Sequence, residues 1–319
     1  MRHSDFDITG KIRTTDPVEV GKEVLRLFAC LYPGQTAPQV KRAFRDMWLL
    51  YGGKHPAYHP CDTEYHDTQH VLDVTLTMAR LLDGYERGRN GNAPLPPEHF
   101  SVGVITALFH DFGYLRRRND YMHRFGAEYT LTHVERGSNF LLGYFPAIGL
   151  ERYAMAASQL VHFTGYERKV DTIHLDDPVL RRVGEILGTA DIIAQMSDRC
   201  YLEKCRDRLY PEFVLGGLAR RRMPDGQVVA VFESGDDLVR KTPGFYINAM
   251  KRLDKQLNRA YVYAEKHFGG PNVYLEEMDK NMRYAQVTTA DSGHEPLRRT
   301  PPITLPPNLR DYPEDLVIP

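Results

Sequence analysis

Apolar residues recur every three or four positions through most of the chain, and this spacing constrains the fold more than any other feature. In the first such stretch the repeating residues are Val20, Val24, Leu27 and Leu31, which would form one face of a helix. Further helical stretches are predicted at 40–50, 68–84, 97–112, 127–142, 150–163, 178–199, 201–219, 244–267 and 272–284.

Strands do not alternate with these helices, and the sequence contains no internal repeat. The one plausible β segment is 226–232, which follows the turn Pro224-Asp225-Gly226. The pattern therefore predicts an all-α fold, a multi-helix bundle with at most one short β-hairpin.

The two ends of the chain differ in character from the middle. Residues 1–17 are mostly polar and are predicted to be a flexible N-terminus. Residues 287–319 contain seven prolines, a composition that favours an extended tail, either disordered or draped over the body of the protein. One helical domain is therefore expected at 18–286.

Charge and composition exclude several classes of protein. The 319 residues include 41 Lys and Arg against 42 Asp and Glu, so the net charge is −1. Such a balance leaves no general basic field for nucleic acid or an anionic membrane. The runs Arg116-Arg117-Arg118 and Arg220-Arg221-Arg222 are local, and we interpret them as solvated loop faces.

The chain has the features of a cytoplasmic protein. No stretch approaches the roughly 20 apolar residues of a membrane span, and the N-terminus has no apolar core of a secretion signal. The four cysteines have neither CxxC spacing nor the density of a disulfide scaffold. We expect no nucleic-acid or membrane partner, while an oligomer is compatible with the sequence.

A pair of histidines stands at the start of one predicted helix. His66 and His70 are four residues apart, so both imidazoles would lie on one face of the helix, one turn apart. Taken alone, such a pair is more often two exposed histidines than a site.

Two further polar groups interrupt apolar helical runs. His110 and Asp111 end the run 104–109, and Asp191 lies within 188–194. Buried imidazole or carboxylate groups are costly unless they are paired or bind a metal. For Asp191 the alternative is an ion pair with Arg182 or Arg199.

Three separate helices thus offer two imidazoles and two carboxylates, with no thiolate. This donor set suits a catalytic zinc, manganese or iron ion that keeps open positions for water. We predict a metal site formed by His70, His110, Asp111 and Asp191.

The motifs that contain these residues follow one another in the order H…HD…D, and they are Tyr65-His66-Asp67-Thr68-Gln69-His70, Phe109-His110-Asp111 and Ala190-Asp191. In this order the chain resembles the HD-domain metal-dependent phosphohydrolases. Within that superfamily it is most similar to the class I cyclic-nucleotide phosphodiesterases, whose YHNxxH motif is matched here except that Asp67 replaces asparagine.

Weaker similarity to the same family continues to about residue 253. The family's glutamate on a later helix is matched by Glu135, and an EF pair followed by QGD is echoed by Glu212-Phe213 and Leu215-Gly216-Gly217. The QxGF motif is echoed by Thr242-Pro243-Gly244-Phe245. The resemblance is stronger for the metal ligands than for the substrate pocket.

The resemblance implies an enzyme that hydrolyses a small phosphorylated substrate, a nucleotide phosphodiester such as a 3′,5′-cyclic nucleotide. It implies two divalent metal ions: a first zinc, manganese or iron ion on the predicted ligands, and a second magnesium or manganese ion that Asp111 bridges. His66 would be the general acid, and Glu135 would position a water of the second metal. Tyr65, Thr242 and Phe245 would contact the substrate, with Phe245 stacked on the base.

Two departures from the family keep alternatives open. Thr242 stands where the family has its purine-binding glutamine, and Tyr114 stands where it has the second histidine of HDxxH. A phosphomonoesterase or nucleotidase of the HD type is therefore the alternative enzyme, and a non-catalytic nucleotide-binding module is the alternative outside enzymes.

Individual residues carry alternatives too. His133 could take the role of Glu135, two residues later, and Phe245 could be an ordinary core residue. His162 lies on an otherwise apolar helix and is predicted to be a satisfied core histidine rather than a metal ligand.

Overall fold

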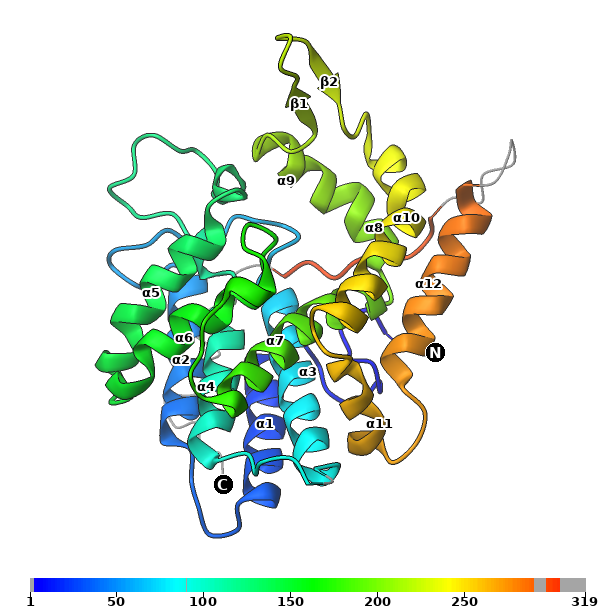
Figure 1. Ribbon diagram of the computed structural model, residues 1–319. Coiled ribbons are helices and arrows are strands. Elements are labelled where there is room, and N and C mark those ends of the chain that lie inside the picture. Colours follow the sequence, from blue (N-terminus) through cyan, green and yellow to red (C-terminus); the bar gives the residue numbers. More distant parts are fainter. Residues whose placement is uncertain (1–2, 90, 290–296, 305–319) are drawn as a thin grey trace.

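The structure is a computed structural model that describes residues 3–89, 91–289 and 297–304 (Figure 1). Helices dominate this part of the chain, and its only sheet is a two-stranded antiparallel hairpin. The prediction of an all-α bundle with one short hairpin is therefore confirmed.

The long helices are α1 Pro17–Leu31, α2 Pro38–Tyr51, α3 Thr68–Arg87, α4 Pro97–Leu108, α5 His133–Ala147, α7 Pro178–Ser197, α10 Gly235–Lys255 and α12 Val273–Thr289. Shorter helices are α6 Ala154–Leu160, α8 Tyr201–Lys204, α9 Tyr210–Leu215 and α11 Tyr263–Phe268. The hairpin strands are β1 Arg220–Arg222 and β2 Val228–Ala230.

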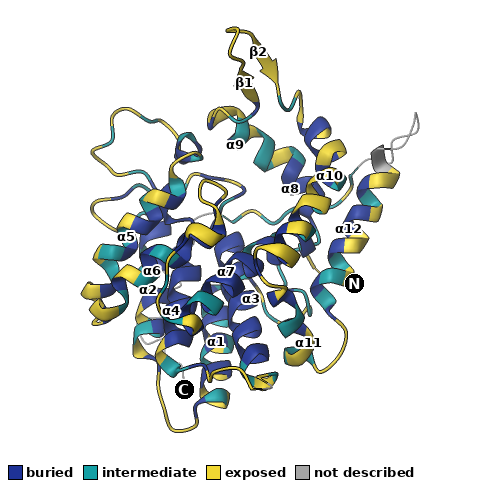
Figure 2. Cartoon of the chain, viewed as in Figure 1, coloured by how far each residue is buried: buried dark blue, intermediate teal, exposed yellow. Residues whose placement is uncertain are grey.

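Helix α3 lies at the centre of the bundle and packs against α1, α4, α7 and α11. It is buried on almost every side, and α7 is nearly as enclosed (Figure 2). Side-chain oxygens cap both helices: Asp67 accepts a hydrogen bond from the backbone of α3, and Asp177 does so for α7, which satisfies amide groups that the first turn leaves free. These two central helices carry two of the four predicted metal ligands, His70 on α3 and Asp191 on α7.

The second half of the chain departs from the predicted helix boundaries. The helix predicted at 201–219 is divided by a π-helical turn, Cys205–Leu209. The helix predicted at 244–267 begins earlier, because Ser234 caps α10. It ends at Lys255, and shortly after this end Asn258 and Arg259 adopt positive φ angles of 50° and 55°. The predicted strand shortens to β2, which pairs with β1.

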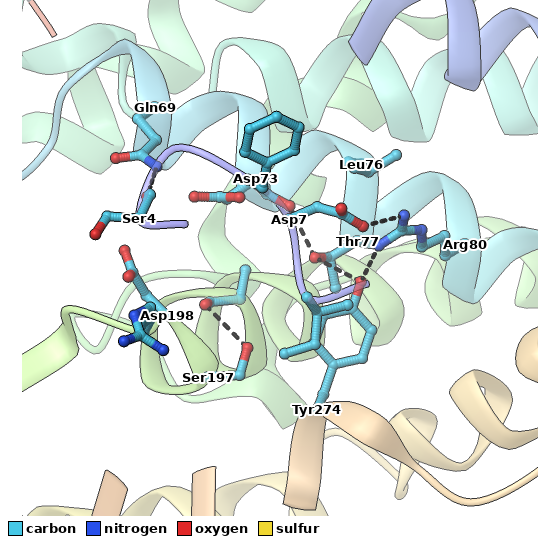
Figure 3. A pocket seen from close by; sticks show the side chains of 14 residues that line it. Ser4, Asp7, Gln69, Asp73, Leu76, Thr77, Arg80, Ser197, Asp198 and Tyr274 are labelled. Atoms are coloured by element: carbon cyan, nitrogen blue, oxygen red, sulfur yellow. Dashed lines mark hydrogen bonds and ion pairs between the residues drawn. The ribbon is translucent and has the colours of Figure 1, made fainter. Parts of the chain in front are cut away.

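The described part of the N-terminus, which was predicted to be flexible, makes contacts with the helical body. Asp7 is buried, and its carboxylate forms an ion pair with Arg80 of α3. Arg80 in turn donates to the Tyr274 hydroxyl of α12 at 3.2 Å, as Figure 3 shows. The buried guanidinium needs a counter-charge, and the polar N-terminal segment supplies it.

The tail is described only at 297–304; residues 290–296 and 305–319 lie outside the described residues. The described piece is extended and crosses the helical body (Figure 1). Arg208 donates to the Pro302 carbonyl at 2.6 Å, and the Thr304 hydroxyl donates to Asp67. This piece is thus draped over the body, one of the two arrangements predicted for the tail.

Across the described helices, none has both the length and the apolar composition that crossing a bilayer requires.

Candidate metal centre

Three elements that are distant in sequence bring the predicted metal ligands together. His70 lies in the first turn of α3, and Asp191 lies in the second half of α7. His110 and Asp111 follow the end of α4, in the turn before the 3-10 helix η1, Phe112–Tyr114. The chain leaves helical geometry at this turn, so two adjacent side chains can point to one place.

The four side chains are close enough to share one cation. Oδ2 of Asp111 is 3.2 Å from Nε2 of His70 and 3.2 Å from Nε2 of His110. Oδ1 of Asp191 is 3.5 Å from Nε2 of His70. The ligand atoms of His70, His110 and Asp191 all lie within 4.8 Å of one another. Asp191 therefore belongs to this cluster, and not to an ion pair with Arg182 or Arg199.

Hydrogen bonds orient the ligands for metal binding. Nδ1 of His110 donates to the Ala107 carbonyl at 2.7 Å, which turns Nε2, the atom that would bind a metal once deprotonated, toward the cluster. The Asp67 carboxylate accepts from the backbone N–H of His70 at 2.9 Å and fixes the start of α3. The His110 contact is the supporting contact that metal-binding histidines usually have, whereas the Asp67 contact is a helix cap that fixes the backbone of His70.

The donor set fits a divalent cation. Oδ2 of Asp111 is buried and has no hydrogen-bond donor among the described residues. Burial opposes ionisation of this carboxyl group, but His110 and His66 hold the pKa of Asp111 well below its usual value. An ionised, buried carboxylate beside two imidazole rings is a set of groups that a metal ion would satisfy, with the imidazole protons displaced when the ion binds.

The other oxygen of Asp111 faces a second possible metal position. Oδ1 lies 3.7 Å from Nε2 of His133. Nδ1 of His133 donates to the Thr130 carbonyl at 2.7 Å, so its Nε2 lone pair is also free. The sequence had offered His133 as an alternative to Glu135, and the geometry places His133 beside the bridging carboxylate.

Glu135 lies farther out. Its side chain is 54% exposed and pairs with Arg168 at 2.9 Å, while Oε2 is 3.8 Å from Nε2 of His162. His162 itself is buried; Nδ1 donates to Glu167 at 2.7 Å, but Nε2 has no hydrogen-bond partner among the described residues. His162 therefore lies in the core, as predicted, with Nδ1 bonded to Glu167.

His66 is held beside the cluster by a carboxylate that the sequence analysis gave no role. Nδ1 of His66 donates to Oε2 of Glu212 at 2.5 Å, and Oε1 accepts from the Tyr65 backbone at 2.6 Å. Burial lowers the pKa of His66, but Glu212 and Asp111 outweigh it and raise the pKa to about 9. The motif around Glu212-Phe213 was the signal that could have identified this partner.

Tyr114, which replaces a histidine of the resembling family, is an aromatic spacer. Its ring stacks on His66 with centroids 4.5 Å apart and on His133 with centroids 4.4 Å apart. Stacking on both sides lets Tyr114 orient the two histidine rings. Tyr114 has no imidazole nitrogen, so it adds no strong metal ligand.

The cluster opens into a cavity of about 880 Å³. All three predicted substrate residues line this cavity. The Tyr65 hydroxyl donates to Gln195 at 3.0 Å, Thr242 is buried and donates to the Leu238 carbonyl at 3.0 Å, and Phe245 is 41% exposed. Phe245 is therefore a wall residue of the cavity and not part of the buried core.

Comparison with known proteins adds no relative: no protein-family model, no curated protein and no solved structure matches this chain.

Proposed function

We propose that this protein is a metal-dependent phosphohydrolase that cleaves a phosphodiester, with a 3′,5′-cyclic nucleotide as one form of the substrate. The observation that carries the proposal is the convergence of His70, His110, Asp111 and Asp191 from three elements at the base of one cavity. The motif order that resembles the HD-domain phosphohydrolases supports the same chemistry.

The four residues would hold a first zinc, manganese or iron ion. Asp111 would bridge to a second magnesium or manganese ion, with His133 beside it. When bound, such a pair of ions supplies hydroxide at neutral pH and neutralises the phosphoryl oxygens.

His66 would act as the general acid. Glu212 accepts the hydrogen bond from Nδ1, so Nε2 is left to donate a proton to the departing oxygen of the substrate. The raised pKa of His66, about 9, keeps the imidazole protonated near neutral pH.

The position that would read the base carries a threonine, Thr242. The Thr242 hydroxyl is engaged with a backbone carbonyl of its own helix, and a threonine cannot make the two-point amide contact of a glutamine. This observation favours the alternative enzyme, a nucleotidase of the HD type that acts on a monoester.

A substrate panel with metal analysis tests the proposal. Purified protein would be assayed for bound metals and then, with manganese, on cyclic mononucleotides, nucleoside monophosphates and bis-p-nitrophenyl phosphate. Turnover of diesters is expected. Turnover of monoesters alone would replace the proposal with the nucleotidase, and tight binding of nucleotides without turnover would replace it with the non-catalytic module.

A further inference from the structure

Strand β1 forms part of the cavity wall, and its side chains carry positive charge where the metal cluster carries carboxylates. Arg220, Arg221 and Arg222 form this strand, all three are exposed, and all three line the same cavity as His70 and Asp111. The sequence had suggested a solvated loop face. Instead, the run is a strand fixed by pairing of Arg221 with Val229 in β2.

The three guanidinium groups have no counter-charge in the described residues. No ion pair or hydrogen bond from these side chains is formed within that part of the chain. By contrast, the other cation of the cavity wall, Lys241, pairs with Asp237 at 2.8 Å. The arginines of β1 therefore line the cavity without a counter-charge from the described residues.

Two carboxylates of the cavity lie apart from its arginines, while the more exposed Glu135 and Glu167 of the lining pair with Arg168 and His162. The carboxylates of Asp111 and Asp191 lie at its buried end, where the metal ions would neutralise them. The arginines lie at the exposed end, on a hairpin that projects from the helical body in Figure 1. A substrate with a single phosphate would satisfy the metal end and leave three cations without a partner.

The lining of the cavity also includes aromatic side chains. Phe213 and Phe232 pack with ring centroids 5.6 Å apart, and Tyr166 and Phe245 also line the cavity, 66% and 41% exposed. Flat rings of this kind suit a nucleobase. The cavity volume of about 880 Å³ is in the range of sites for molecules of nucleotide size, roughly 300–1,000 Å³.

We propose that β1 is a second phosphate subsite, so that the substrate is a nucleotide that carries a further phosphate group remote from the one at the metals. Guanidinium groups bind phosphate oxygens through paired hydrogen bonds, which gives them an advantage over a point charge. This inference rests on the proposed function for the identity of the metal end, and names the class of substrate that the cavity would select.

The test compares ligands that differ by one phosphate. Binding of nucleoside 5′-monophosphates and of the corresponding 3′,5′-bisphosphates would be measured by calorimetry for adenosine, guanosine, cytidine and uridine, with manganese and again with EDTA. For at least one base we expect the bisphosphate to bind about tenfold more tightly, equivalent to about 1.4 kcal/mol, and this advantage should shrink at high salt.

The variant that tests the subsite is R220Q/R221Q/R222Q. Its bisphosphate advantage should fall to less than about twofold, while circular dichroism and metal content report that the protein is folded. The matched control K22Q/R42Q/R45Q removes the same charge from α1 and α2, away from the hairpin (Figure 1), and should keep the full advantage.

Three outcomes overturn the subsite: no bisphosphate advantage for any base, an unchanged advantage in the β1 variant, or an equal loss in the control. Its failure is distinguishable from failure of the proposed function. If the protein hydrolyses diesters without any bisphosphate advantage, the subsite is wrong and the phosphohydrolase stands. If the advantage depends on β1 but no substrate is hydrolysed, the subsite stands and the phosphohydrolase is wrong.

Discussion

The two ends of the cavity are built in different ways. At the inner end, buried helices place His70, His110 and Asp111 within hydrogen-bonding distances of one another. At the outer end, an exposed two-stranded hairpin presents side chains that have no protein partner in the described residues. The difference shows that buried packing defines the positions of the inner groups, whereas the outer groups are left to interact with whatever enters the cavity.

The strongest test of the inner end is Asp111→Ala. This change removes the carboxylate that lies between both metal positions, so we expect loss of both ions. Turnover of bis-p-nitrophenyl phosphate should fall by at least about 100-fold, because metal ions contribute several kcal/mol to such reactions. Elemental analysis and initial rates measure the two effects.

The exposed Asp171 offers the control, since Asp171→Ala also removes one carboxylate but from a surface turn. It should keep metal and activity. An Asp111→Ala protein that retained both metals and full activity would contradict the inner site.

His66→Ala separates chemistry from metal binding. The imidazole is near the cluster but is held by Glu212, so metal content should be unchanged. Loss of a general acid lowers the rate of turnover about 10²–10⁴-fold. The decrease should be largest for diesters with an alkoxide leaving group and smaller for p-nitrophenyl esters.

Glu212→Gln is the companion variant, because an amide oxygen can still accept the hydrogen bond from Nδ1 while the charge is lost. Glu212→Gln should lower turnover less than His66→Ala does, with the same dependence on the leaving group. Equal rates for His66→Ala and the wild type on an alkyl diester would remove His66 from the mechanism.

A comparison of His133→Ala with Glu135→Ala determines which of the two residues belongs to the inner end of the cavity. His133 is 3.7 Å from Asp111, whereas Glu135 is half exposed and pairs with Arg168. Residues that support a metal ion usually contribute about 10–100-fold, so we expect a loss of this size for His133→Ala and a smaller one for Glu135→Ala. Titration of the second metal and initial rates would show the order, and the reverse order would favour Glu135 as the metal-side residue.

Asp73 of α3, which lies near Asp7 of the N-terminal segment, provides a prediction on stability. Burial and the neighbouring Asp198 raise the pKa of Asp73 to about 8, against partial compensation by Lys204 and Thr14, with Asp7 also nearby. A carboxyl group whose pKa is raised in the folded protein lowers the free energy of unfolding. The loss grows as the pH rises from the pKa of the unfolded chain, 3.8, to the pKa in the fold, about 8, and does not change above that.

Asp73→Asn should therefore raise the melting temperature at pH 9 by roughly 2–4 °C, for about 1 kcal/mol, and by less at pH 6. Thermal unfolding followed by circular dichroism measures the difference, with Asp171→Asn as the exposed control. A gain that does not depend on pH would show that the charge of Asp73 is not what matters.

The sequence predicted the inner end better than the outer one. Periodic apolar residues indicate helices, and a buried Asp111 or Asp191 stands out against its apolar neighbours, so the ligand cluster could be inferred without coordinates. The Glu212–His66 contact joins residues that are 146 positions apart, so the Glu212-Phe213 motif was visible in the sequence but nothing there paired it with His66.

The outer end was harder to predict for a different reason. A run of arginines has the same appearance in a solvated loop and in a cavity wall, because exposed charge leaves no periodicity. Likewise, the polar N-terminus gave no sign that Asp7 would neutralise the buried Arg80. Such partners are chosen by tertiary packing alone.

The contact between Thr304 and Asp67 has a consequence for the order of folding. Asp67 caps the turn that presents His70, and its other carboxylate oxygen meets a hydroxyl 237 positions later in the chain. Contacts of such long range carry the largest loop-closure entropy and form slowly. During synthesis the helical body can therefore assemble well before this turn receives its last neighbour, and we expect the capacity to take up metal to mature after the bundle has collapsed.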